Sequence, residues 1–305
     1  MKKCLKLRPA VANSGFKMDG YYVWCGSVIK ENGKYYLFAA RWPKEKGFPL
    51  GYLTYSEIVL ATSDDLSKPF KFEKVIISKR DGNKWDSCMA HNPYIFKDGD
   101  TYVLFYIGSP DGQAVTRSIG YAYSKSLTDG WVRSEESIKL PPDANNPAVI
   151  KANNGKYLLY YRDGHLKVYV AQADKFSGPY EIVNERIFPK GSIEDMYTYI
   201  DENGKYIMFA EDAGGKYTGV VKSGVRFESC DGINWDGDSA ALAYDFDVDY
   251  DDGTHLFLQR RERPFILDDD NGKRYLFTTA KINGEDMMTG GDTWNMVQEI
   301  EEEYR

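Results

Sequence analysis

Residues 191–212 read GSIEDMYTYIDENGKYIMFAED, and this stretch decides the fold. Two short apolar runs, rich in aromatic and β-branched residues, flank the turn at Asn203-Gly204. An Asn-Gly pair between two such runs predicts a β-hairpin, because both turn positions require φ > 0. Two adjacent carboxylates, Glu194 and Asp195, stand at the opening of the first predicted strand.

The same hairpin pattern occurs five times along the chain. The copies align on the turn glycines Gly33, Gly99, Gly155, Gly204 and Gly272, which are separated by 49 to 68 residues. These intervals are too irregular for a solenoid and suit propeller blades with loops of variable length.

A second half-repeat follows four of the five hairpins, and in it a small residue precedes an aromatic residue. These pairs are Ser63 and Phe70, Ser124 and Trp131, Ala173 and Tyr180, and Ser229 and Trp235. Two hairpins per repeat make a four-stranded antiparallel sheet, so the sequence predicts an all-β, five-bladed β-propeller that forms one domain over residues 1–305. A β-sandwich is the rival fold, but it does not explain five copies of one turn with matching downstream aromatics.

The fifth repeat lacks the second half-motif. We expect a strand around residues 293–297 to complete this last blade, with help from the N-terminus. The acidic run at residues 299–303 is expected to be a solvated tail.

Composition excludes several classes of function. The net charge is −7 and no stripe of Lys and Arg is present, which argues against a nucleic-acid partner. No apolar run is long enough to span a membrane. The four cysteines show no CxxC spacing, so free thiols are favoured over a zinc site or a disulfide framework. No secretory signal follows the N-terminal residues, so a cytoplasmic location is expected, or a secreted or periplasmic one if a signal peptide has been removed.

The residues that open the first strand of each blade are expected to converge at one end of the central channel. Each opening is a short polar or aromatic run: Trp24-Cys25-Gly26, His91-Asn92-Pro93, Asn145-Asn146-Pro147, Glu194-Asp195-Met196 and Glu262-Arg263-Pro264. Polar, ionisable and aromatic groups that converge on one cleft are typical of a small-molecule site. Taken singly, however, an Asn-Pro pair can serve only to start a strand. That alternative stays open for Asn92 and Asn146.

The carboxylate pair predicts a general acid. Adjacent residues of a strand face opposite sides, so at most one of Glu194 and Asp195 can point into water away from the axis. Burial and like charges would raise the pKa of the other, as in a group that donates a proton. Asp86 and Asp19 precede the second and first inner strands and are further candidates to reach the channel mouth, although each is also a common turn residue.

The repeat and its openings resemble the five-bladed glycosidases, which include glycoside hydrolase families 43, 32, 117 and 130. The resemblance extends over about residues 24–297. It implies an Asp in the first blade as base or nucleophile, an Asp in the third blade that tunes a pKa, and a Glu in the fourth blade as acid. These positions fall on Cys25, Asn146 and Glu194, so only the last is a carboxylate in this chain.

Another part of the chain is similar to family 130. The runs at residues 146–150, 160–162 and 194–196 match that family's Asn-Pro, Tyr-Arg and Glu-Asp-Pro segments, with Met196 in place of Pro. This resemblance implies Asp195 as the proton donor and either hydrolysis or phosphorolysis of a glycosidic bond.

The sequence therefore favours a glycoside hydrolase that acts on an oligosaccharide or glycan. Such an enzyme needs an acid, Glu194 or Asp195, and a second group, for which Asp86, Asp19 and Glu262 are the candidates. The candidates for substrate binding are the aromatic, basic and amide side chains Trp24, Arg41, Trp42, Trp85, His91, Asn92, Asn146, Arg162 and Arg263. No cofactor is expected, although the question of a structural cation in the central channel stays open.

Two alternatives remain. In a glycoside phosphorylase, Arg162, Arg263 and His91 would hold phosphate. A sugar-binding propeller without activity would explain why carboxylates are missing at Cys25 and Asn146. The sequence does not distinguish an inverting from a retaining mechanism.

Overall fold

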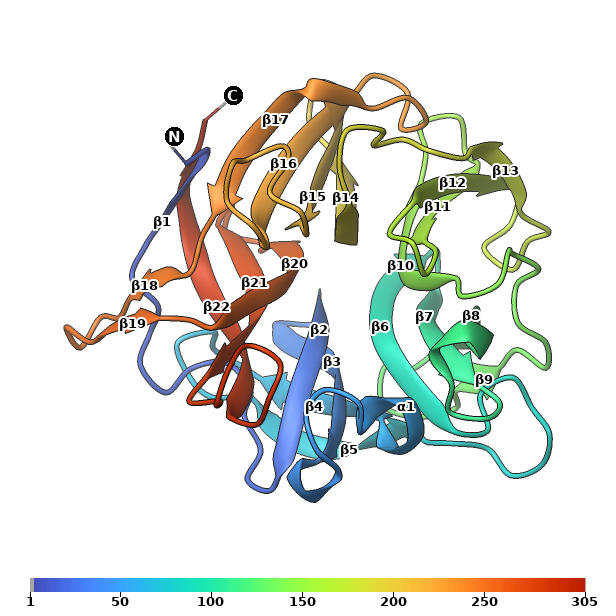
Figure 1. Ribbon diagram of the computed structural model, residues 1–305, viewed down its shortest axis with the longest axis horizontal. Coiled ribbons are helices and arrows are strands. Elements are labelled where there is room, and N and C mark those ends of the chain that lie inside the picture. The colour runs from blue at the N-terminus through green and yellow to red at the C-terminus, as the bar shows by residue number, and fades with distance from the viewer. Residues whose placement is uncertain (1–2, 305) are drawn as a thin grey trace.

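The computed structural model describes residues 3–304, and this part of the chain forms five four-stranded antiparallel sheets. The sheets stand in a ring around a central axis, with one edge of each sheet facing that axis (Figure 1). The predicted five-bladed propeller is therefore confirmed. The five turn glycines all have positive φ, between 58° and 83°, as the hairpin turns require.

Within each blade, the strands follow one another from the axis outward. The first blade contains β2 (Tyr21–Glu31), β3 (Lys34–Pro43), β4 (Glu57–Ser63) and β5 (Lys71–Ile77). The second contains β6 (Met89–Asp98), β7 (Thr101–Ser109), β8 (Ser118–Ser124) and β9 (Val132–Arg133). The third contains β10 (Asn145–Lys151), β11 (Tyr157–Arg162), β12 (Val168–Ala173) and β13 (Glu181–Asn184). The fourth contains β14 (Ile193–Ile200), β15 (Tyr206–Asp212), β16 (Ser223–Ser229) and β17 (Asp236–Tyr244). The fifth contains β20 (Arg260–Asp268), β21 (Arg274–Ile282), β22 (Asp292–Glu303) and β1 (Leu5–Leu7).

The remaining elements are short. A separate hairpin of β18 (Asp247–Asp249) and β19 (His255–Phe257) precedes the fifth blade, and three helical turns lie in loops: η1 (Lys44–Lys46), α1 (Tyr52–Tyr55) and η2 (Ala114–Thr116). In residues 3–304 no helix has the length and apolar character needed to cross a membrane.

The N-terminal strand completes the ring. β1 pairs antiparallel with β22, so the last blade combines both ends of the chain, as expected (Figure 1). The prediction of a solvated acidic tail is wrong, because residues 299–303 belong to β22. The Glu303 carboxylate lies 2.7 Å from both Arg226 and Arg274, so these ion pairs hold the end of the strand against its neighbours.

Removing the anchor of β1 is expected to destabilise the protein. Leu5 is 3% exposed and packs in a cluster with Phe209 and Ile300. Leu5→Ala should lower the free energy of unfolding by about 2–5 kcal/mol, as for other buried leucines. The neighbouring Lys6 is exposed, and Lys6→Ala is the matched control in urea unfolding. Equal, small losses for both variants would contradict closure of the blade by β1.

Candidate active site

The inner strand of every blade carries a bulge at the same place. The pairing register shifts between residues 24 and 27, 91 and 94, 145 and 148, 194 and 197, and 262 and 265. One residue within each shift has a positive φ: Cys25 (55°), Asn92 (52°), Asn146 (54°), Asp195 (60°) and Arg263 (57°). Positive φ is uncommon in residues other than glycine, so five equivalent cases make the bulge a feature of the repeat.

These bulges bring consecutive side chains into one pocket. A pocket at the axis is lined by both members of every opening pair: Trp24 and Cys25, His91 and Asn92, Asn145 and Asn146, Glu194 and Asp195, and Glu262 and Arg263. The expectation that Glu194 and Asp195 face opposite sides is therefore wrong, because the bulge interrupts the alternation of the strand.

The first blade supplies an aromatic wall. Trp24, Trp42, Phe48 and Tyr52 line the pocket from β2, β3 and the loop that carries η1 and α1. The ring of Phe48 lies 5.2 Å from that of Trp24 and stacks on that of Trp42 at 5.9 Å. Sequence reasoning identified the two tryptophans but missed Phe48 and Tyr52, because they lie in a loop outside the repeat.

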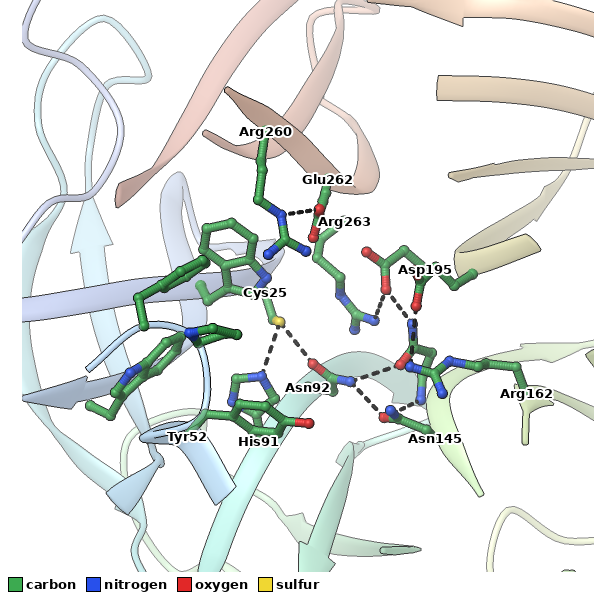
Figure 2. A pocket seen from close by; sticks show the side chains of 16 residues that line it. Cys25, Tyr52, His91, Asn92, Asn145, Arg162, Asp195, Arg260, Glu262 and Arg263 are labelled. Atoms are coloured by element: carbon green, nitrogen blue, oxygen red, sulfur yellow. Dashed lines mark hydrogen bonds and ion pairs between the residues drawn. The ribbon is translucent and has the colours of Figure 1, made fainter. Parts of the chain in front are cut away.

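The second and third blades supply amides in a directed chain of hydrogen bonds. Arg263 Nη1 donates to Asp195 Oδ1 over 2.8 Å, and Asn146 Nδ2 donates to the same oxygen. Asn92 Nδ2 then donates to Asn146 Oδ1 over 3.0 Å, which leaves Asn92 Oδ1 to accept from the Cys25 thiol. Figure 2 shows this chain running from Cys25 to Asp195. Because Cys25 is a donor in it, and burial raises the pKa of its thiol, Cys25 does not replace the carboxylate that the resemblance places there.

His91 is an uncharged ring that lies between Ser56 and Cys25. The Ser56 hydroxyl lies 3.0 Å from the Ala90 carbonyl and 2.8 Å from His91 Nδ1. His91 Nε2 lies 3.6 Å from Cys25 Sγ, whose single proton is donated to Asn92. Burial, with Arg263 and Arg117, lowers the pKa of His91 well below its ordinary value, so the ring stays uncharged.

The fourth and fifth blades supply an acidic wall in which every carboxylate has a cation. Arg162 Nη2 lies 3.1 Å from Glu194, Arg263 contacts Asp195, and Arg260 contacts Glu262. In Figure 2, Arg260, Glu262, Arg263 and Asp195 lie together on one side of the pocket.

Two carboxylates of this wall have pKa values shifted in opposite directions. Burial raises the pKa of Asp195, Arg263 lowers it, and Glu194 and Glu262 raise it, with a net shift upward. Burial also raises the pKa of Glu262, but Arg260 and Lys222 lower it more. Neighbouring carboxylates with opposite shifts are typical of an acid and base pair.

Sequence reasoning missed Glu211 and Lys222. Glu211 is the second-to-last residue of β15 and pairs in register with Glu194, within the stretch that decided the fold. Lys222 lies in the loop before β16, and its Nζ is 2.6 Å from Glu211. Counting equal distances from the turn would have paired Glu194 with Asp212, because the bulge shifts the register by one residue, so the sequence did not reveal Glu211. Nothing in the sequence indicates Lys222.

Four predicted site residues lie elsewhere among the described residues. Asp86 is fully buried, 2.6 Å from Arg80 and 2.7 Å from the Tyr106 hydroxyl, so it neutralises a cation inside the second blade. Asp19 is exposed in the turn before β2. Neither Asp86 nor Asp19 lines the pocket, so the expectation that they reach the channel mouth is wrong.

The other two are Trp85 and Arg41. The Trp85 ring packs against Tyr106 at 4.9 Å, and Arg41 pairs with Glu57 at 2.8 Å. Both side chains are occupied within their own blades and do not line the pocket.

One described group has the spacing to hold a metal ion. Oxygens of Asp195, Glu211 and Glu262 lie within 4.8 Å of one another. The Lys222 ammonium, however, is 2.6 Å from Glu211 and 3.8 Å from Glu262, so a protein cation already stands among these oxygens.

Comparison with known proteins gives the fold. No protein-family profile matches the chain, and no curated protein has a matching sequence. A solved structure described as a glycoside hydrolase has a TM-score of 0.74 at 15% identity, and the match covers 99% of this chain and 94% of that one. A family 117 glycoside hydrolase from the marine bacterium Zobellia galactanivorans has a TM-score of 0.68 at 18% identity, with 98% and 91% covered.

A third similar structure is a family 43 β-xylosidase/α-arabinofuranosidase from a compost microbial metagenome, in complex with xylotriose. Its TM-score is 0.65 at 15% identity, and the match covers 96% of this chain and 95% of that one. At such identities the likeness shows that this chain has the five-bladed fold of these glycoside hydrolases.

Proposed function

We propose that the protein is a glycoside hydrolase that cleaves a glycosidic bond of an oligosaccharide or glycan, with Asp195 as proton donor and Glu262 as the second carboxylate. The observation that carries this proposal is the Asp195–Glu262 pair in the pocket wall, with opposite pKa shifts and oxygens within 4.8 Å of each other. Glycosidic cleavage needs one protonated and one ionised carboxyl group beside the scissile bond. The shared fold with glycoside hydrolases supports the same reading.

The spacing is compatible with a retaining mechanism, which we propose here. Retaining enzymes hold their two carboxyl groups about 5–5.5 Å apart, whereas inverting enzymes leave about 6.5–9.5 Å for a water molecule. An approach of 4.8 Å or less between oxygens of Asp195 and Glu262 is compatible with the shorter spacing. Glu262 would then attack the anomeric carbon while Asp195 protonates the leaving oxygen.

Phosphorolysis is less well supported than hydrolysis. A phosphate site needs cationic groups free to bind an anion, and Arg162, Arg260 and Arg263 of this pocket each contact a carboxylate.

A panel of nitrophenyl glycosides and oligosaccharides tests the proposal. Wild-type protein should release product from at least one glycoside in phosphate-free buffer, and Asp195→Asn should slow release from the oligosaccharide by about 10²–10⁴-fold. Turnover only with added phosphate would show a phosphorylase. Binding by calorimetry without turnover on any substrate would show a sugar-binding propeller.

The aromatic wall should bind the sugar ring. Trp24→Ala is expected to raise KM by about 2–12-fold, because an aromatic contact is worth about 0.5–1.5 kcal/mol beyond burial. Trp85→Ala is the matched control, since this tryptophan packs against Tyr106 away from the pocket. Steady-state kinetics measures both, and equal KM changes would contradict a specific role for Trp24.

We also propose that the reaction needs no cofactor, since Lys222 already places a cation among the carboxylates. Dialysis against a chelator should therefore leave kcat/KM within about 2-fold of its original value, well under the roughly 10²-fold cost of losing a major electrostatic group. A loss of activity restored by a divalent cation would contradict this expectation.

A further inference from the structure

Glu211 lies behind the pocket wall, out of reach of a substrate. It is 1% exposed, and it does not line the pocket. Its Oε1 is 2.6 Å from Lys222 Nζ. Its Oε2 is buried and has no hydrogen-bond partner among residues 3–304. The mechanism proposed above does not use this carboxyl group.

Lys222 stands among three carboxylates. Its ammonium lies 2.6 Å from Glu211, 3.7 Å from Glu194 and 3.8 Å from Glu262. The shortest of these contacts is to the residue that does not reach the pocket. Glu211 is therefore the group that fixes Lys222 in position, and Glu194 and Glu262 receive its charge.

A charged Glu211 would be costly in this environment. An ionised carboxylate with one unpartnered buried oxygen loses its hydration without replacement. Burial, Glu262 and Glu194 raise the pKa of Glu211 well above its ordinary value, Lys222 lowers it, and Asp195 raises it further. Two more groups face this cluster: Arg260 of β20, and Tyr244 of β17, whose hydroxyl is also buried without a partner in the described chain. A proton on Glu211 removes this cost and preserves its contact with Lys222.

We propose that Glu211 is an uncharged positioning residue, which holds Lys222 against the pocket so that the ammonium keeps Glu262 ionised. The role of Glu262 rests on the function proposed above, whereas the uncharged state of Glu211 does not. An ionised Glu211 would neutralise Lys222, but a protonated one leaves the full positive charge of Lys222 for Glu194 and Glu262.

The charge state of Glu211 can be tested without a substrate. A carboxyl group whose pKa is raised by folding makes the protein lose stability as pH rises from the unfolded value, near 4.5, toward the folded value. Glu211→Gln cannot titrate, so the free energy of unfolding of this variant, relative to wild type, should rise over that pH range. Urea unfolding at a series of pH values from 4 to about 9 measures the difference.

Glu228→Gln is a control of opposite sign. A hydrogen bond with Lys205 lowers the pKa of Glu228, although its partial burial raises it. Glu228→Gln should therefore lose stability relative to wild type as pH rises toward 4.5, so the series for this control extends below pH 4. If Glu211→Gln instead follows the wild-type pH dependence, Glu211 is ionised in the folded protein and the proposal fails.

Kinetics tests the positioning role. Lys222→Met should move the acidic limb of the kcat/KM profile upward by about 1 pH unit or more, because Glu262 loses a nearby cation, and Lys222→Arg should restore its position. Glu211→Leu removes the oxygen that holds Lys222 and should move the limb in the same direction, whereas Glu211→Gln keeps an accepting oxygen and should move it less.

An equal loss of kcat/KM at every pH in Lys222→Met and Glu211→Leu would show a merely structural role. If no glycoside is turned over, the proposed function fails, and the stability series still decides the state of Glu211.

Discussion

Asp195→Asn is expected to lower kcat on an unactivated glycoside by about 10²–10⁴-fold, the usual contribution of a positioned general acid. Asparagine keeps the size of the side chain and an oxygen that accepts from Arg263 and Asn146, but it carries no acidic proton. A nitrophenyl glycoside has a leaving group that needs little protonation, so the kcat/KM of this variant on it, which reports formation of the covalent intermediate, should stay close to the wild-type value. Steady-state kinetics on the two substrates measures this selective rescue.

The pH profile provides a second readout of the same group. Because burial raises the pKa of Asp195, its proton persists above the ordinary range and is lost as pH rises, which gives the alkaline limb of kcat/KM. Asp195→Asn should lack this limb on the nitrophenyl substrate. A limb that stays unchanged would assign it to another group.

Glu194→Gln is the matched comparison. The resemblance to the larger group of five-bladed glycosidases places the acid at Glu194, and the resemblance to family 130 places it at Asp195. In the structure the Glu194 carboxylate lies 3.1 Å from Arg162 and 3.7 Å from Lys222. We therefore expect a smaller loss that the nitrophenyl substrate does not rescue. If Glu194→Gln shows the large, rescuable loss and Asp195→Asn does not, Glu194 is the acid.

The fold was predictable because the repeat specifies local geometry. Each hairpin contains a turn glycine that takes positive φ, and strands on both sides of the turn supply apolar residues to the core. Closure of the ring was only partly predictable. The pairing of β1 with β22 is a contact between chain ends that are far apart in the sequence. The acidic residues of β22 gave no strand signal, because the cations that stabilise Glu303, Arg226 and Arg274, come from neighbouring strands.

The site was predictable only where it follows the repeat. The five opening pairs converge as expected because they occupy equivalent places in equivalent blades. Their side-chain directions were not predictable from strand alternation, because a bulge turns both Glu194 and Asp195 toward the axis. Loop residues were least predictable: Tyr52 reaches the pocket, and Asp86 folds back into its own blade.

The second large effect is expected at Glu262. Glu262→Ala removes the carboxylate that Arg260 and Lys222 keep ionised, and it should lower kcat by about 10⁴-fold, the upper end of the contribution of a positioned acid or base. Unlike Asp195→Asn, this variant should show the loss on nitrophenyl and unactivated substrates alike, because a good leaving group does not replace the missing nucleophile.

Azide distinguishes the role of Glu262. In Glu262→Ala, a small anion can enter the space left by the side chain and attack the anomeric carbon, so azide should restore turnover and yield a glycosyl azide of inverted anomeric configuration. In Asp195→Asn, the covalent intermediate still forms on Glu262, so azide attack should give the retained configuration. Product analysis by NMR reads out both cases. A wild-type product of inverted configuration would instead make Glu262 the base that activates water in an inverting enzyme, because a single displacement by water inverts the anomeric carbon and passes through no covalent intermediate.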